Sequence, residues 1–539
     1  MKFPLLCVLA AIGSASLLPA QEAAWRSALY PADWQPGFRD ASGRFLHDFS
    51  YAGYHRGEKP VPHVEGPVID VTKPPYQADP TGGKDSTSDI QAALDAAADG
   101  DGGIVFLPAG TYRIQPQGTV DYVLRIRGDK TVLRGAGADK TFLFNDTPMM
   151  RGKVVISVEP DKPMDWRDEG NGILASPLAQ DAPNQSREIF LKSVTGFSPG
   201  DLVVLRSDLT QRFIDEVEMT GKWKPAGAAS PNRTLMFCRR IESVDPAKSS
   251  VTLDVPLRYP VRVDDLGRLV KIPGKLIEEC GLEDFSIGIK QHPGTGTEEE
   301  DFNKPGTVGY DVHGSGAISL KNAENCWIKG VKSYAPPGND PNIHLVSSGI
   351  ALRRSRFVTV EDCSMGFSQY KGGGGNGYLF THNGQENLII NCRAEAGRHN
   401  YDFGTMACSG NVISRCFAKD GSHGSDFHMF LSMSNLLDQM TCDGDFLEAR
   451  YYRPWGGNPV HGVTTTQSVF WNSKGLRYSK ERQAVVWSQQ VGDGYVIGTS
   501  GPCDKVDSDD FVEGVGKGDS LVPASLYQDQ LRRRLRAAK

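Results

Sequence analysis

The chain has 539 residues, of which 59 are Lys or Arg and 65 are Asp or Glu, so its formal net charge is −6 at pH 7. This mild acidity, without a basic stripe, argues against a partner made of nucleic acid. No apolar run of about 18 residues follows the N-terminal region, so we predict no membrane-spanning helix.

Residues 1–20 have the pattern of a secretory signal peptide. Lys2 precedes the apolar run Leu5–Ile12, and the segment SASLLPA ends at Ala20. We predict cleavage near Ala20 and a secreted or periplasmic protein. One of the 10 cysteines, Cys7, lies in this segment. The mature chain would keep an odd number, which does not suggest a disulfide framework.

Residues 21–66 are rich in aromatic residues, Gly and Pro without a sustained period, and we expect an irregular N-terminal segment. The following stretch, Val68–Ile114, predicts a strand, a helix and a second strand. Ser86 or Thr87 is the expected N-cap of the helix. The apolar positions of this helix recur at helical spacing, at Ile90, Ala93, Leu94 and Ala97. Such a helix is suited to cover the open end of a solenoid.

Val68–Ile114 resembles the N-terminal signature of the pectate lyase superfamily, in the branch described as rhamnogalacturonase or epimerase-like, through its segments DVT, ADPTG, DST, IQAALDAA and GGIVFLPAGTYRI. The resemblance implies an all-β fold, a right-handed parallel β-helix, here over residues 67–500 with an N-terminal capping helix. It implies no single reaction, because the superfamily includes lyases, hydrolases and epimerases.

The β-helix period disappears between about residues 145 and 275. GDLVVLRSDL, TLMFCRRIESVD and SVTLDVPLRYPV are alternating strands separated by Gly, Pro and Asp. We predict a strand-rich insertion here, either a small antiparallel unit or a set of elongated coils.

A tail and a helix are predicted for residues 501–539. The chain ends in SLYQDQLRRRLRAAK, a basic amphipathic segment. We expect its apolar face to dock on the solenoid through Leu526, Leu531 and Leu535, with a membrane-surface role as the alternative.

A repeat of 24 residues governs the second half of the chain. Asn387, Asn411 and Asn435 recur at this interval, and the same interval relates GRHNYDF (397–403) to GSHGSDF (421–427). Residues one coil apart in a parallel β-helix stack at about 4.8 Å. We therefore predict an inward-facing asparagine ladder. Stacked buried thiols are expected at Cys363, Cys392 and Cys416.

The same period places Asp402 on Asp426, about 5 Å apart. At that distance one carboxyl group must have a raised pKa, or a cation must bridge the two. Most of the 11 histidines lie on these regular coils. Strand alternation leaves His399 and Tyr401 undecided between core and outer face, because glycines flank the strand.

A second resemblance concerns GRHNYDF, SDFHM and HGVTTTQSVFWN (461–472). They are similar to the C-terminal half of a group of secreted bacterial β-helix proteins that carry a G-R-H-D-F segment, a His-containing strand and an H-G segment. Matching position by position implies four site residues, Arg398, His399, His428 and His461. This chain has Asn-Tyr-Asp where that group has Asp-Phe, so the resemblance assigns no role to Asp402.

Three chemistries suit these residues. In β-elimination a neutral His removes a proton, Arg398 or a cation neutralises a uronate carboxylate, and Tyr401 or another acid protonates the leaving oxygen. In glycoside hydrolysis, Asp402 and Asp426 act as acid and base or nucleophile. An oxygen-rich face can also bind Ca²⁺. The expected substrate-binding residues are Lys371, Tyr401 and His423.

We predict a secreted carbohydrate-active enzyme that cleaves a polysaccharide, one that contains uronate, by β-elimination. A glycoside hydrolase and a non-catalytic carbohydrate-binding solenoid are the alternatives. The expected partner is the polysaccharide, and Ca²⁺ is the candidate metal. The predicted catalytic residues are Arg398, His399, Asp402, Asp426, His428 and His461.

Overall fold

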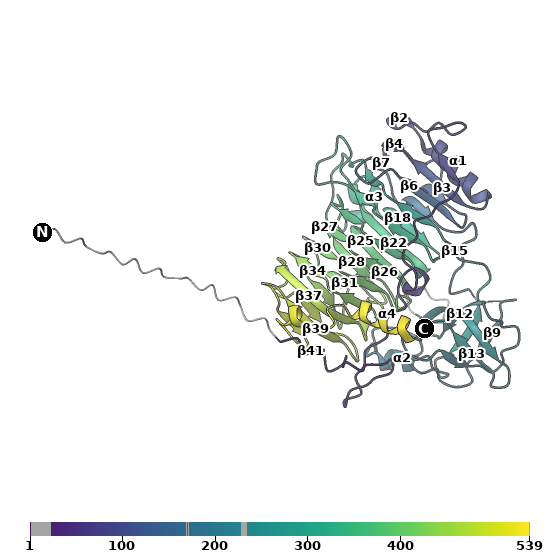
Figure 1. The fold of residues 1–539 in the computed structure, drawn as a ribbon, viewed down its shortest axis with the longest axis vertical. Coiled ribbons are helices and arrows are strands. Elements are labelled where there is room, and N and C mark those ends of the chain that lie inside the picture. Colours follow the sequence, from purple (N-terminus) through teal and green to yellow (C-terminus); the bar gives the residue numbers. More distant parts are fainter. Residues whose placement is uncertain (2–22, 169, 171, 228–233, 538–539) are drawn as a thin grey trace.

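A computed structural model describes residue 1 and residues 23–168, 170, 172–227 and 234–537. The predicted signal peptide therefore lies outside the described residues. The described chain is a right-handed parallel β-helix with a separate antiparallel sheet beside it (Figure 1), which confirms the predicted fold class. No helix within these ranges is both long and apolar enough to cross a membrane.

Three walls of parallel strands form the β-helix. The first wall contains β1 (Val68–Asp70), β3 (Gly103–Leu107), β6 (Thr131–Gly135), β16 (Gly281–Glu283), β20 (Trp327–Lys329), β23 (Thr359–Glu361), β26 (Leu388–Ile390), β29 (Val412–Ser414), β33 (Leu436–Asp438), β37 (Val469–Arg477), β39 (Tyr495–Ser500) and β41 (Phe511–Glu513). The second wall contains β2 (Thr81–Asp85), β4 (Gly110–Ile114), β7 (Thr141–Asn145), β17 (Ser286–Ile289), β21 (Lys332–Ser333), β24 (Ser364–Gly366), β27 (Arg393–Glu395), β30 (Phe417–Lys419), β34 (Thr441–Asp443) and the end of β37.

The third wall carries the side chains that concern function. It contains β5 (Tyr122–Ile126), β8 (Val154–Val158), β18 (Gly316–Lys321), β22 (Ser348–Arg356), β25 (Tyr378–Gln385), β28 (His399–Phe403), β31 (Ser425–Phe427), β35 (Leu447–Ala449), β38 (Val486–Ser488) and β40 (Val506–Ser508). Short pairs complete the β-helix, formed by β15 (Ile277–Glu278), β19 (Ala323–Glu324), β32 (Ser432–Met433) and β36 (Thr465–Thr466).

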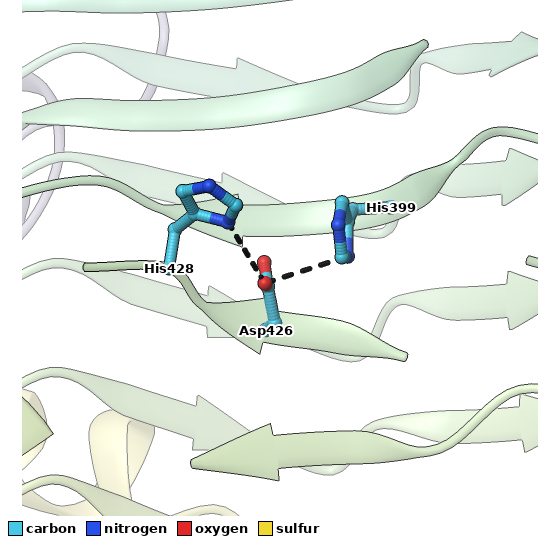
Figure 2. A group of neighbouring side chains, drawn as sticks. All are labelled: His399, Asp426 and His428. Carbon is cyan, nitrogen blue, oxygen red and sulfur yellow. Dashed lines mark hydrogen bonds and ion pairs between the residues drawn. The ribbon is translucent and has the colours of Figure 1, made fainter. Parts of the chain in front are cut away.

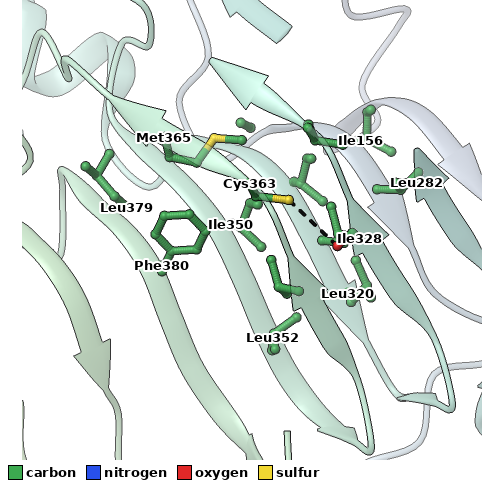
Figure 3. Close-up of a cluster of buried hydrophobic side chains, with 14 of the residues drawn as sticks. Ile156, Leu282, Leu320, Ile328, Ile350, Leu352, Cys363, Met365, Leu379 and Phe380 are labelled. Atoms are coloured by element: carbon green, nitrogen blue, oxygen red, sulfur yellow. Dashed lines mark hydrogen bonds between the residues drawn. The ribbon is translucent and has the colours of Figure 1, made fainter. Parts of the chain in front are cut away.

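The core is a column of apolar side chains stacked from coil to coil. Register pairing along the third wall places Ile156, Ile318, Ile350, Phe380 and Tyr401 one above the next. Figure 3 labels Ile156, Ile350 and Phe380 of this column, together with core residues from elsewhere in the coils such as Ile328 and Cys363. Because each coil buries its apolar face only against its neighbours, the column stabilises the array as a whole.

The asparagine ladder lies at the turns that lead into the first wall. Asn411 Nδ2 donates to Asn435 Oδ1 at 3.0 Å, and Asn411 Oδ1 accepts from the backbone N–H of Asn387 at 3.0 Å. All three side chains are fully buried. The predicted ladder is therefore confirmed, and it satisfies turn groups that no strand pairs.

The predicted stacked cysteines are confirmed as free, buried thiols. The Sγ atom of Cys416 accepts from the backbone N–H of Cys392 at 3.3 Å, and both residues, like Cys363, are buried and unbridged. These cysteines occupy the apolar position of the repeat and act as small core residues.

Helix α1 (Thr87–Asp99) lies at the end of the β-helix that holds β2 and β4 (Figure 1). Its buried residues include the four predicted positions, Ile90, Ala93, Leu94 and Ala97. They join the main core cluster. The helix therefore covers the first coils, as its apolar stripe predicts.

The insertion is a six-stranded antiparallel sheet in the order β10-β13-β12-β11-β14-β9. Its strands are β9 (Ala175–Pro177), β10 (Glu188–Phe190), β11 (Leu202–Arg206), β12 (Met236–Asp245), β13 (Ser250–Leu253) and β14 (Arg268–Lys271), and it includes helix α2 (Gln211–Glu216). Strand β8 still pairs in the third wall, so the sheet begins later than residue 145. Arg258 fixes it to the β-helix through Glu386, with Nε–Oε1 and Nη2–Oε2 distances of 2.9 and 2.5 Å.

Helix α4 (Leu526–Ala537) docks on the flank of the first wall, beside the irregular N-terminal segment. Asp438 accepts from the backbone N–H of Leu526 at 3.0 Å and thereby holds the start of the helix. Leu526 and Leu531 pack in a cluster with Trp471, as expected, whereas Leu535 is half-buried and lies outside that cluster. The other helices are α3 (Val308–Val312) and the 3-10 turns η1 (Tyr54–Gly57), η2 (Asp301–Asn303) and η3 (Gly518–Ser520).

Replacing the middle rung of the ladder tests its contribution to stability. We expect Asn411→Ala to destabilise the fold by about 1–3 kcal/mol, because buried donors and acceptors lose their partners. The measurement is the midpoint of chemical denaturation. Asn342→Ala, at an exposed turn position, is the control. Equal midpoints for the two variants would contradict a structural role for the ladder.

Candidate active site

A cleft of about 980 Å³ lies on the outer face of the third wall. Two rows of side chains, both running from coil to coil, form its floor. The first row follows the register Thr381, Asp402, Asp426 and Glu448. The second row begins with the register pair Arg353 and Asn383 and continues over the next coils through Gly404, His428 and Arg450. A linear ligand along the β-helix axis would cross these coils in turn.

The predicted stack of Asp402 on Asp426 is confirmed by the pairing of β28 with β31. Asp426 Oδ2 lies 3.1 Å from His428 Nδ1, 3.4 Å from His399 Nδ1 and 2.7 Å from Arg453 Nη2. Figure 2 shows the two imidazoles on either side of this carboxylate. The Asp426 side chain is 0% exposed, so it lies beneath the surface of the cleft and holds His428, His399 and Arg453 in place.

The two aspartates have opposite pKa shifts. Burial raises the pKa of Asp402 well above its usual value, and the neighbouring Asp426 carboxylate raises it further. Burial alone would also raise the pKa of Asp426, but the nearby His399, Arg453 and His428 hold it well below its usual value. The surroundings therefore favour the protonated form of Asp402 and the ionised form of Asp426.

His428 connects Asp426 to the open cleft. Its Nδ1 faces the Asp426 carboxylate and also lies 3.1 Å from Arg453 Nη1, while its Nε2 lies 3.2 Å from the hydroxyl of Tyr378. Because a carboxylate only accepts hydrogen bonds, we assign the proton to Nδ1, so that Nε2 accepts from the Tyr378 hydroxyl. His428 and Tyr378 both line the cleft. The result is a carboxylate–imidazole–phenol relay that ends at the ligand space.

His399 and His461 flank this relay as neutral rings. His399 Nδ1 donates to the Gly424 carbonyl at 2.7 Å, and burial lowers the pKa of His399 to about 3. Burial, with the charge of the nearby Arg453, lowers the pKa of His461 to about 4. The His461 ring centroid lies 5.1 Å from that of His428. Both histidines line the cleft, so they can orient a ligand without carrying charge.

The structure places the other predicted residues differently. The Arg398 guanidinium forms two bonds with the Glu299 carboxylate, at 2.7 and 2.8 Å. His423 lies 3.2 Å from Glu481 at the rim of the cleft. Lys371 accepts from Arg398 Nη1 through its carbonyl at 2.9 Å, and its side chain does not line the cleft.

Tyr401 lies in the core, which corrects the prediction that it binds substrate. Its side chain is 0% exposed, and its hydroxyl donates to the backbone carbonyls of Cys392 and Phe417 at 2.9 and 3.2 Å. A phenol that is enclosed and bonded in this way does not reach the cleft. The alternation of β28 thus turns Tyr401 inward and Asp402 outward.

Several cleft residues escaped the sequence analysis: Tyr378, Arg353, Asn383, Glu448, Arg450, Arg453 and Trp455. Tyr378 is the register partner of His399, but the 24-residue period counted back from His399 reaches Gly375 and so misses it. Arg453 and Trp455 lie on a hairpin closed by the bridge between Arg453 and Gly462, outside the repeat. No period in the sequence points to them.

The only group of metal-ligand side chains found among the described residues is His399, Asp426 and His428, whose ligand atoms lie within 4.8 Å of one another. The Arg453 guanidinium already contacts two of these three, at 2.7 Å from Asp426 and 3.1 Å from His428. A divalent cation there would meet this fixed positive charge. The group therefore fits Ca²⁺ poorly, and its imidazoles are not the oxygen ligands that Ca²⁺ prefers.

The chain is a right-handed parallel β-helix protein with a polar groove on one wall. Residues 71–173 match the family model described as Rhamnogalacturonase A/epimerase, pectate lyase-like. This match confirms the resemblance predicted from the N-terminal stretch. A search of curated proteins gave no significant match.

Among solved structures, the tailspike gp61 of Pseudomonas phage phi297 is similar with a TM-score of 0.42 and 11% identity, over 84% of this chain and 75% of that chain. The Streptococcus pneumoniae adhesin PfbA gives a TM-score of 0.41 and 13% identity, over 84% and 99%. The tailspike of E. coli bacteriophage HK620, in complex with a pentasaccharide, gives a TM-score of 0.41 and 11% identity, over 80% and 57%. Similarities this distant carry no argument about substrate or reaction.

Amide substitutions of the two stacked aspartates should have opposite effects on stability at neutral pH. The native state favours the protonated form of Asp402, so the free energy of unfolding falls as the pH rises through the raised pKa of this group. Asparagine cannot ionise, so Asp402→Asn should keep or raise the unfolding midpoint at neutral pH. Asp426→Asn should lower the free energy of unfolding by up to about 3–5 kcal/mol, because it removes one of the two carboxylates that contact the buried Arg453. The measurement is thermal or chemical unfolding at neutral and acidic pH. Equal losses for both variants would contradict the assigned protonation.

Proposed function

We propose that the protein is a secreted polysaccharide lyase that cleaves a uronate-containing chain by β-elimination. The single observation that carries this proposal is the relay from Asp426 through His428 to Tyr378 at the floor of the cleft. A β-elimination needs a base beside the proton to be removed and an acid beside the leaving oxygen. One imidazole and one phenol in contact supply both.

In this mechanism His428 Nε2 removes the proton at C5 of the uronate. The electron pair of the C–H bond forms the C4–C5 double bond, and the C4–O bond breaks. Tyr378 then donates its proton to the leaving oxygen and recovers a proton from the His428 imidazolium. Burial, with the charge of the nearby Asp426, raises the pKa of Tyr378 well above its usual value. The phenol therefore stays protonated until the leaving oxygen develops charge.

Asp402 has a distinct role in this proposal. Removing the C5 proton places negative charge on the uronate carboxylate, and donors aimed at that charge lower the barrier. A carboxylic acid kept neutral by its environment can donate such a hydrogen bond. Asp402 lines the cleft and is kept neutral by burial and by Asp426. Asp426 itself touches no substrate and acts as a positioning residue for His428.

Hydrolysis is the second candidate, because a protonated carboxyl group in a cleft also suits a general acid. Glu448 is two coils from Asp402, roughly 10 Å away by coil spacing, close to the separation of carboxyl groups in inverting hydrolases. Arg450 and Arg453 both bind the Glu448 carboxylate, which weakens it as a base. The predicted pairing of Asp402 with Asp426 is disfavoured, since the Asp426 side chain is fully enclosed.

A panel of uronate polysaccharides tests the reaction type. We expect products with unsaturated uronate ends, detected by their ultraviolet absorbance. New reducing ends without that absorbance would replace the lyase with a hydrolase, and binding without products would indicate a carbohydrate-binding protein.

Substitutions in the relay test its members. His428→Ala and Tyr378→Phe should each lower kcat by about 10²–10⁴, the usual contribution of a general acid or base. In β-elimination, Asp402→Asn should lower kcat less than the other two substitutions, because asparagine keeps a hydrogen-bond donor. If Asp402 were instead the general acid of a hydrolase, Asp402→Asn should lower kcat as much as they do. His63→Ala, at an exposed position, is the control. Full activity of His428→Ala would overturn the mechanism.

A further inference from the structure

The cleft contains one exposed arginine, Arg353 on β22, that forms no ion pair with any carboxylate of the described residues. The neighbouring Arg354 behaves differently, since its Nη1 lies 2.6 Å from Asp165 Oδ2. Most other arginines near the cleft are also paired, such as Arg398 with Glu299.

Asn383 lies beside Arg353 on the next coil, in register with it. Its amide borders the cleft, and a Cβ atom at Gly404 would come within 1.9 Å of Asn383 Oδ1. Glycine at that position therefore leaves room for the amide and keeps the floor open between Asn383 and His428. A guanidinium beside an amide is the donor set that recognises an anionic group next to a hydroxyl.

We propose that Arg353 and Asn383 form an anion-binding subsite that recognises a carboxylate or sulfate ester on the polysaccharide, several sugar residues from the bond that is cleaved. Along this row Arg353 lies three coils and Asn383 two coils from His428, about 14 and 10 Å by coil spacing. This subsite rests on the proposed function. It adds that the substrate carries a second negative charge at a distance from the reacting uronate. A short oligosaccharide that ends before Arg353 gains nothing from it.

Binding to a catalytically silenced protein separates this proposal from the lyase activity. In the His428→Ala background we compare Arg353→Gln with Arg354→Gln, a neighbouring change of the same charge. The probes are polygalacturonate, a sulfated neutral galactan and an uncharged β-glucan. We expect Arg353→Gln to weaken binding of the anionic chain about 10- to 100-fold, the usual effect of losing a charge-assisted hydrogen bond, and Arg354→Gln to leave it unchanged.

The two anionic probes distinguish the source of the charge. Selective loss with polygalacturonate assigns a carboxylate, and selective loss with the sulfated galactan assigns a sulfate ester. Arg353→Lys should retain part of the affinity, because it keeps the charge without the planar fork. Equal binding by Arg353→Gln and Arg354→Gln, or no binding of either anionic probe, would overturn the subsite. Loss of binding in Arg353→Gln without cleavage of any polysaccharide by the parent protein would uphold the subsite and reject the lyase.

Discussion

The structure depends on the parallel register between coils, which forces equivalent residues to stack at about 4.8 Å. Inside the β-helix this constraint is favourable. Asn411 bonds to the asparagines above and below it, and apolar side chains pack in columns. Outside, the same constraint places like charges together, as at Asp402 and Asp426. The chemistry of the cleft follows from how the protein resolves that conflict.

A residue outside the repeat compensates this repulsion. Arg453 contacts both Asp426 and Glu448, and its positive charge stabilises these two stacked carboxylates. Its hairpin is held by the insertion, because Trp223 Nε1 donates to the Val460 carbonyl at 3.0 Å. Trp223 also packs in a cluster with Phe430 of the β-helix. The antiparallel sheet thus supports the cleft although its strands do not line it.

The sequence was informative wherever the period of 24 residues holds, since a fixed interval converts distance along the chain into contact. It therefore predicted the partners of Asp402 and Asn411. It could not predict Arg453, because a hairpin interrupts the period there. Tyr401 and His399 are two residues apart on β28 and by alternation should face the same side, yet Tyr401 faces the core and His399 lines the cleft. The alternation of side chains therefore fails at His399, the first residue of β28, and the sequence alone does not show this.

His399, His428 and His461 are three of the four histidines that line the cleft, and their surroundings make them unequal. His399 and His461 have lowered pKa values of about 3 and 4, so each binds a proton weakly and is a poor base near neutral pH. His428 has the ionised Asp426 on one nitrogen and Tyr378 on the other. An adjacent carboxylate stabilises the imidazolium that forms when a proton is removed from substrate. These electrostatic differences among three neighbouring rings support His428 as the proposed base.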